Sequence, residues 1–235
     1  MGFLGKLFGG GEAKKPLTAR EAVPLAQEAL REWSATQAAS AQMCCVYTSA
    51  EDANRELRKD GRCRAWHVDF YMERSRSFYL ARVVDGKVKG RERPLSNDPV
   101  EYVYCVYGAE GGEKKFAEPL FLPGEWVDSD VAAQAAFAAL EREMAGTDRG
   151  ILDDYIPLAV CLPAKYVRYV QPDASGLQLT QAPPQELCYA VLLSHIDADC
   201  HDSLIVYVDA ATGREAATEK FRFQAFQTTG FSADW

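Results

Sequence analysis

The chain has 235 residues, of which 48% are hydrophobic, and a formal net charge of −8 at pH 7. This composition is typical of a globular protein, and no apolar run reaches the ~18 residues that a membrane-spanning helix requires. The acidic balance disfavours nucleic acid as the main partner.

The charge is distributed unevenly along the chain. The segment from Arg55 to Arg93 holds 12 Lys or Arg and 6 Asp or Glu, a local balance of +6 that leaves −14 for the remainder. Arginines beside aromatic rings are typical of protein or single-stranded nucleic-acid contacts. We therefore expect a basic face that binds an acidic protein surface, with a solvated face that has no partner as the alternative. The candidate contact residues are Arg74, Arg76, Arg82, Trp66 and Tyr71.

The cysteines indicate a reducing compartment. Their number, seven, is odd, their spacing is irregular, and no C-x-x-C pair occurs, so we expect no disulfide framework. Because Met1 to Phe8 also lacks the features of a signal peptide, we expect a cytoplasmic protein. Cys44 and Cys45 open an apolar run, and neighbouring residues of a strand point to opposite faces. We expect one thiol in the core and the other on the opposite face.

The first 16 residues read as a flexible segment, because three glycines follow a short apolar stretch. The alternative is an amphipathic foot that makes a weak peripheral contact with a membrane or a partner. Its apolar side chains would be Phe3, Leu4, Leu7 and Phe8.

The next segment, 17–123, is expected to form a first unit of one helix and a sheet. Thr18-x-x-Glu21 has the spacing of a capping box and precedes apolar residues at helical spacing. Pro24 lies inside this pattern and is expected to kink the helix or delay its start. A strand at 43–48 and a charged surface helix at 49–60 follow.

Hairpins dominate the rest of this unit. Alternating apolar residues predict strands at 64–72 and 77–84, and Asp85-Gly86 is a type I′ turn signal that leads into a third strand at 87–93. Further strands are expected at 100–107 and 116–122.

Pro123-Gly124 marks the expected boundary with a second unit, 124–235. Asp128, Ser129 and Asp130 offer N-caps for an Ala-rich helix that runs to Met144. Strands are expected at 156–162, 165–171 and 177–181. The stretch 186–223 then reads as two apolar strands around a polar turn, a Thr-Gly turn and a third, more polar strand. The fold class is therefore α+β, with two similar units that each pack a helix on an antiparallel sheet, and the two sheets can join in one body.

The end of this stretch carries a family resemblance. The order helix, strand, strand, closing on V-x-V-D-A-x-T-G, resembles the PepSY-type domain, mainly over 130–215 and more weakly over 18–92. The matching residues are Val206, Val208, Asp209, Ala210, Thr212 and Gly213. The resemblance implies a small α+β unit, often duplicated, that acts as a binding or inhibitory module. Such domains are commonly exported or attached to a membrane.

The polar turn at 195–202 is the densest cluster of possible metal ligands. Imidazole suits zinc and carboxylates suit harder ions, so a metal sensor or a metal-dependent enzyme is one hypothesis. The spacing matches neither an EF-hand nor a zinc motif, and a solvated hairpin tip is the other hypothesis. The candidate ligands are His195, Asp197, Asp199 and His201.

No arrangement in the sequence favours catalysis. His67-x-Asp69 and His195-x-Asp197 each place two polar groups on one face of a strand, but neither adjoins a nucleophile in a recognisable motif. Phosphate-binding and zinc-protease motifs are also missing, so we expect no cofactor. The sequence favours a non-catalytic binding or assembly protein.

Overall fold

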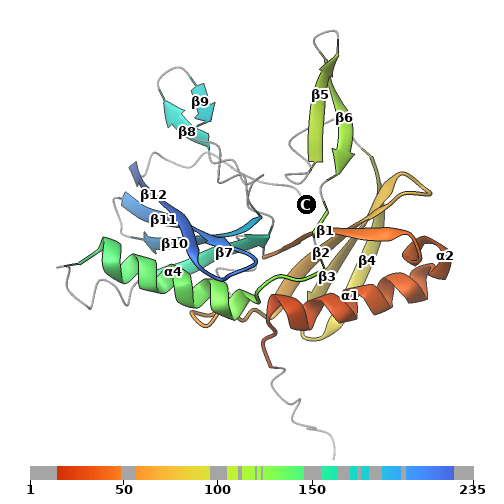
Figure 1. Ribbon diagram of the computed structural model, residues 1–235, viewed down its shortest axis with the longest axis horizontal. Coiled ribbons are helices and arrows are strands. Elements are labelled where there is room, and N and C mark those ends of the chain that lie inside the picture. The colour runs from red at the N-terminus through yellow and green to blue at the C-terminus, as the bar shows by residue number, and fades with distance from the viewer. Residues whose placement is uncertain are drawn as a thin grey trace, which may run out of the picture.

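A computed structural model describes residues 15–48, 57–95, 105–110, 113–119, 121–122, 124–145, 155–162, 170–173, 176–179, 187–196 and 200–224. Its centre is an eight-stranded sheet of order β12-β11-β10-β7-β1-β2-β3-β4, in which every neighbouring pair is antiparallel. Helices α1 and α4 lie end to end along one side of this sheet (Figure 1).

Each half of the sheet follows the same order of elements, a helix and then four strands. The first half consists of α1 (Ala19–Trp33), β1 (Ala41–Tyr47), β2 (Ala65–Met72), β3 (Ser77–Val84) and β4 (Lys87–Pro94), with a one-turn helix α2 (Ala35–Ala38) after α1. The second half consists of α4 (Ser129–Glu143), β7 (Ile156–Leu162), β10 (Cys188–Ile196), β11 (Cys200–Asp209) and β12 (Glu215–Gln224). The expected α+β class, with two similar helix-on-sheet units, is confirmed.

The halves meet at the centre of the sheet. Strand β1 pairs with β7 through Val46 with Leu162 and Tyr47 with Cys161. Two separate hairpins, β5 (Cys105–Glu110) with β6 (Glu113–Pro119) and β8 (Val170–Asp173) with β9 (Gly176–Leu179), lie on the side away from the helices (Figure 1).

Helix α1 forms where its caps and apolar face predict it. Thr18 Oγ1 accepts a hydrogen bond from the Glu21 backbone N–H, and Glu21 Oε2 accepts one from the Thr18 N–H, which completes the capping box. Pro24 is exposed and lies within a continuous helix. The expected delay of the helix start is therefore wrong, because packing of the buried face onto the sheet outweighs one missing backbone bond. The buried residues of this face are Ala19, Ala22, Val23, Ala26 and Leu30.

The turn between β3 and β4 has the backbone that its sequence predicts. Asp85 has φ +52° and Gly86 has φ +73°, as the two central residues of a type I′ turn require. This turn sets the register of β4 against β3, in which Val84 pairs with Lys87 and Arg82 with Lys89.

Two local predictions are corrected. Of the charged helix expected at 49–60, residues 49–56 lie outside the described part of the chain, and Leu57 to Asp60 form no helix but lead into a turn closed by the Arg58 N–H to the Arg62 carbonyl at 2.8 Å. Cys44 and Cys45 do not divide between two faces. The pairing of β1 with β2 shifts between Met43 and Cys45, and this bulge buries both thiols in one cluster with Phe78.

The main core lies between the helices and the sheet and runs through both halves. It joins Trp66 and Val68 of β2 to Tyr189 of β10 and Val206 of β11. The face away from the helices carries two smaller clusters, one around Phe78 and one around Ile205 and Tyr207. Among the described residues, no helix is long and apolar enough to cross a membrane.

Candidate binding surface on strand β4 and the helix joint

The residues of β4 alternate between cations and small or partnered side chains. Lys87, Lys89 and Arg91 are exposed and Arg93 is half-buried. The intervening positions belong to the helix side of the sheet, where Val88 packs against the main core and Glu92 accepts a hydrogen bond from Ser77 Oγ at 2.6 Å. Because successive side chains of a strand point to opposite faces, the four cations all lie on the face away from α1.

Gly90 is the small residue that lets Tyr79 cross β4. A Cβ at this position would lie 1.8 Å from Tyr79 Oη, so only glycine fits beneath the ring. The Tyr79 ring also contacts Trp33, with ring centroids 5.3 Å apart. Burial, and then the nearby carboxylate of Glu32, raise the pKa of Tyr79, so this hydroxyl stays neutral. The helix side of β4 therefore presents Val88 and the Tyr79 and Trp33 rings, with the carboxylate of Glu92 toward the far end of the strand.

Arg82 of β3 completes the basic group. It lies opposite Lys89 and on the same face as the β4 cations, since Ala81 and Val83 on either side of it are in the main core. We call the set Arg82, Lys87, Lys89, Arg91 and Arg93 the basic strip.

A depression of about 380 Å³ lies at one end of the basic strip, where Arg82, Lys87 and Lys89 line it together with Val84 and Asp85. The only carboxylate among these lining residues, that of Asp85, forms an ion pair with Arg64. Both oxygens of Asp85 accept hydrogen bonds from the Arg64 guanidinium, each at 2.6 Å. The depression therefore has a cationic rim that suits an anionic group.

The remaining predicted contact residues lie elsewhere. Arg74 and Arg76 are exposed at the tip of the β2–β3 hairpin, and Arg82 lies six positions after Arg76, roughly 20 Å along the strand. Trp66 is fully buried on the helix side, and its Nε1–H donates to the Leu17 carbonyl at 2.8 Å. Tyr71 is half-buried beside Phe78. Of the five predicted contacts, Arg82 is the one in the basic strip, and Trp66 is a core residue.

The two histidines whose side chains the structure describes lie on opposite faces of the sheet. His67 is on the face of the basic strip, where the Tyr47 ring stacks on it at 4.9 Å. His195 is half-buried on the helix side, 5.5 Å from the ring of Tyr155, which belongs to the main core. The structure therefore does not bring these two imidazoles into one site.

Most of the other predicted ligands and anchors cannot be placed. Asp197, Asp199 and the side chain of His201 lie outside the described residues, as does the N-terminal foot with Phe3, Leu4, Leu7 and Phe8. Within the part of the chain that the structure describes, no group of three or more His, Cys, Asp or Glu is placed to hold a metal ion.

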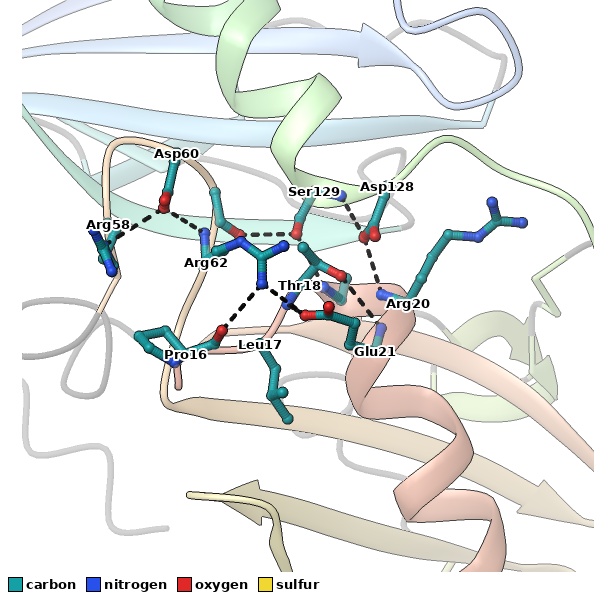
Figure 2. Close-up of polar contacts among 12 residues, drawn as sticks. Pro16, Leu17, Thr18, Arg20, Glu21, Arg58, Asp60, Arg62, Asp128 and Ser129 are labelled. Atoms are coloured by element: carbon teal, nitrogen blue, oxygen red, sulfur yellow. Dashed lines mark hydrogen bonds and ion pairs between the residues drawn. The ribbon is translucent and has the colours of Figure 1, made fainter. Parts of the chain in front are cut away.

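A polar joint between the helices was not predicted from the sequence. The N-termini of α1 and α4 meet, and side chains of α4 cap both helices (Figure 2). Asp128 Oδ1 accepts from the backbone N–H of Ser129 at 2.7 Å and from that of Arg20 at 3.0 Å. Ser129 Oγ accepts from the Ala19 N–H at 2.9 Å and donates to the Gly61 carbonyl at 2.8 Å.

An ion pair closes the outer side of this joint. Arg62 donates to Glu21 Oε2 at 2.8 Å and to the Pro16 carbonyl at 3.2 Å (Figure 2). The hydrogen bond from the Thr18 backbone and then the Arg62 charge lower the pKa of Glu21. The sequence signal for the joint was the Asp128-Ser129-Asp130 cluster, but a cap for a second helix, about 110 residues away, cannot be read from local spacing.

Comparison with known proteins leaves the family open. No family model matches the chain, and no curated protein matches it. A solved structure of a candidate lipoprotein from Clostridium difficile 630 is similar, with 12% sequence identity over 90% of this chain and 97% of that chain, and a TM-score of 0.43. A similarity at this level identifies neither a family nor an activity.

Proposed function

We propose that the protein is a non-catalytic binding or assembly protein of the cytoplasm whose basic strip binds an acidic surface of a partner protein. The observation that carries the proposal is the strip itself, in which five cations share one face at the edge of the sheet in a chain of net charge −8. Charge of one sign on one face of such a chain favours encounter with an oppositely charged partner.

The PepSY-type resemblance is part of the same proposal. Two helix-plus-sheet units in tandem agree with a duplicated binding module, and the motif Val206 to Gly213 closes the second unit. The four cysteines whose side chains the structure describes, Cys44, Cys45, Cys63 and Cys188, are all buried. Their burial supports a reducing compartment, since buried thiols behave as small apolar side chains.

Binding to an acidic polymer tests the proposal directly. Fluorescently labelled polyglutamate is titrated with the protein at low and at moderate salt, and anisotropy reports the complex. We expect binding that weakens as salt rises, because screening shortens the Debye length to about 10 Å at 0.1 M ionic strength.

Charge reversal locates the binding surface. The double variant Arg82→Glu/Lys89→Glu is expected to abolish polyglutamate binding, since it replaces two cations that face each other across β3 and β4. The control Arg31→Glu/Arg214→Glu makes the same change in net charge at exposed positions outside the strip. Equal loss of affinity in both variants would show that only net charge matters, and the proposal would be wrong.

A further inference from the structure

The basic strip lies on an edge strand. In the described sheet, β4 stands at the end of the strand order and pairs with β3 along all eight of its residues, Lys87 to Pro94. The outer side of an edge strand presents backbone N–H and C=O groups that can pair with a further strand. Addition of an extended segment to such an edge is a recurring mode of peptide recognition, in which the backbone supplies affinity and alternate side chains supply specificity.

The side chains of β4 specify what kind of strand fits. Its cations recur at every second residue, at Lys87, Lys89 and Arg91. Side chains on one face of an added strand have the same spacing, roughly 6.8 Å. Acidic residues at alternate positions of that strand would therefore each lie beside a cation, and opposite charges across strands are favourable.

The other face of β4 specifies the remaining positions. On the helix side lie Val88, Gly90 with the hydroxyl of Tyr79 above it, and Trp33 against the Tyr79 ring. Trp33 is 44% exposed, which is unusual for an indole and leaves apolar surface beside this edge. The intervening side chains of an added strand would lie on this side. Apolar or small residues suit the positions beside Val88, Gly90 and Trp33, and a residue without a negative charge suits the position beside Glu92.

A second copy of the same strand does not fit this edge. Pairing β4 with another β4 would place Lys and Arg side chains beside Lys and Arg side chains on the same face. Like charges across strands are destabilising, so the cations select against self-association and in favour of an acidic segment.

We propose that β4 accepts an extended acidic segment of a partner protein as a ninth strand of the sheet. Asp or Glu at alternate positions of the segment lie along the basic strip, and the residues between them lie toward Trp33 and Tyr79. This inference rests on the proposed function and adds to it the conformation and the residue pattern of the partner.

Three synthetic peptides of equal length and net charge test the inference on the full-length protein. The first alternates Glu with Val or Thr. The second has the same composition with the Glu residues in one block. The third repeats the alternating sequence with N-methyl groups on every second backbone nitrogen, which removes donors for a ladder and keeps the charge. We expect the alternating peptide to bind at least about tenfold more tightly than either of the others. The block peptide loses the charge pairs at alternate positions, and the N-methylated peptide loses several backbone hydrogen bonds.

Two further measurements identify the residues of the protein that the peptide contacts. The variant Lys89→Glu/Arg91→Glu is expected to bind the alternating peptide about tenfold or more weakly than the wild type. The control Arg31→Glu/Arg214→Glu is expected to bind it with an affinity within about twofold of the wild type. Amide chemical-shift changes on adding the alternating peptide are expected to centre on Lys87 to Arg91, and the wild-type protein suffices for this measurement even where a variant fails to fold.

The outcomes separate the inference from the proposed function. Equal affinity for all three peptides, with loss in Lys89→Glu/Arg91→Glu, would overturn strand addition and leave binding of acidic partners in place. No binding of any acidic peptide or of polyglutamate would overturn both.

Discussion

At the scale of single residues, Ser129 links the two helices through its side chain. Its hydroxyl accepts from the Ala19 N–H and donates to the Gly61 carbonyl, both buried contacts across the helix joint. Ser129→Ala leaves both backbone groups without their partner, and each such loss costs about 1–3 kcal/mol. We expect the free energy of unfolding, from urea denaturation, to fall by about 2–4 kcal/mol.

The matched control is Ser34→Ala, which removes the side-chain cap of the short helix α2 at a half-buried position. Loss of an ordinary N-cap costs about 1 kcal/mol. If the two variants lose the same free energy, the hydroxyl of Ser129 acts as a simple cap and not as a link between the helices.

Substitutions at Gly61 and Gly86 allow the cost of backbone strain to be measured apart from the cost of steric overlap. Both have positive φ, +75° and +73°, but a Cβ on Gly61 would lie 2.3 Å from the Ser129 carbonyl oxygen, and a Cβ on Gly86 would meet nothing within 4 Å. Gly86→Ala is expected to cost the strain alone, about 1–2 kcal/mol. Gly61→Ala is expected to cost at least about 1 kcal/mol more, because the helix joint must shift. Thermal and urea unfolding of both variants measure the difference. Equal losses in the free energy of unfolding would show that the helix joint shifts without a cost of its own.

At the scale of the elements, the capping box of α1 makes stability depend on pH. The Thr18 backbone and Arg62 lower the pKa of Glu21 in the folded state below its ordinary value of 4.5. The carboxyl of Glu21 then binds a proton more readily in the unfolded chain than in the folded one. Its contribution to the free energy of unfolding is therefore complete above about pH 4.5 and is lost as pH falls through the lower pKa of the folded state.

Glu21→Gln tests this sign, since glutamine keeps an oxygen that can accept from the Thr18 N–H and does not titrate. Urea denaturation is measured for both proteins between about pH 6 and pH 3. We expect the wild type to lose more free energy of unfolding over this interval than the variant. Parallel pH profiles would mean that the Glu21 carboxylate gains nothing from Thr18 and Arg62.

The helices and strands also show which parts of the fold could be predicted from sequence patterns. Periodicity and turn chemistry predicted α1, the β2–β3–β4 meander and its type I′ turn, because these depend on neighbours in sequence. The same rules misjudged Cys44 and Cys45, since one bulged residue reverses every later side chain of a strand. Trp66 was placed in a binding surface by its basic neighbours, although its alternation with His67 assigns it to the core.

The candidate surface was predictable in part. The excess of cations between Arg55 and Arg93 indicated a basic face, and Arg82 is in the strip. The alternation at Lys87, Lys89 and Arg91 was visible in the sequence, but its meaning depends on β4 being an edge, and strand order is a property of long-range pairing. The helix joint required the same long-range information.

At the scale of the whole molecule, the two halves share more than the short β1–β7 pairing. The main core is one cluster that includes Val68 from the first half and Val206 from the second, and the helix joint links Ala19 to Ser129. Neither half can expose its share of this core without removing contacts from the other. Although each half repeats the same order of elements, we therefore expect them to unfold as one cooperative unit.

Two tryptophans provide the measurement. Trp66 is buried in β2, and Trp126 is buried beside Tyr189 of β10, 6.2 Å between ring centroids. The chain has four tryptophans, so Trp33 and Trp235 are first changed to phenylalanine. A further tryptophan-to-phenylalanine change at Trp66 or at Trp126 then leaves one fluorescence reporter in one half, and far-ultraviolet circular dichroism follows both halves. We expect the same urea midpoint from all three signals. Separate midpoints would mean that the shared core is weaker than the packing within each half. In that case Ser129→Ala, which removes the buried hydrogen bonds of the helix joint, should widen the interval between them, whereas in a single unit it lowers one common midpoint.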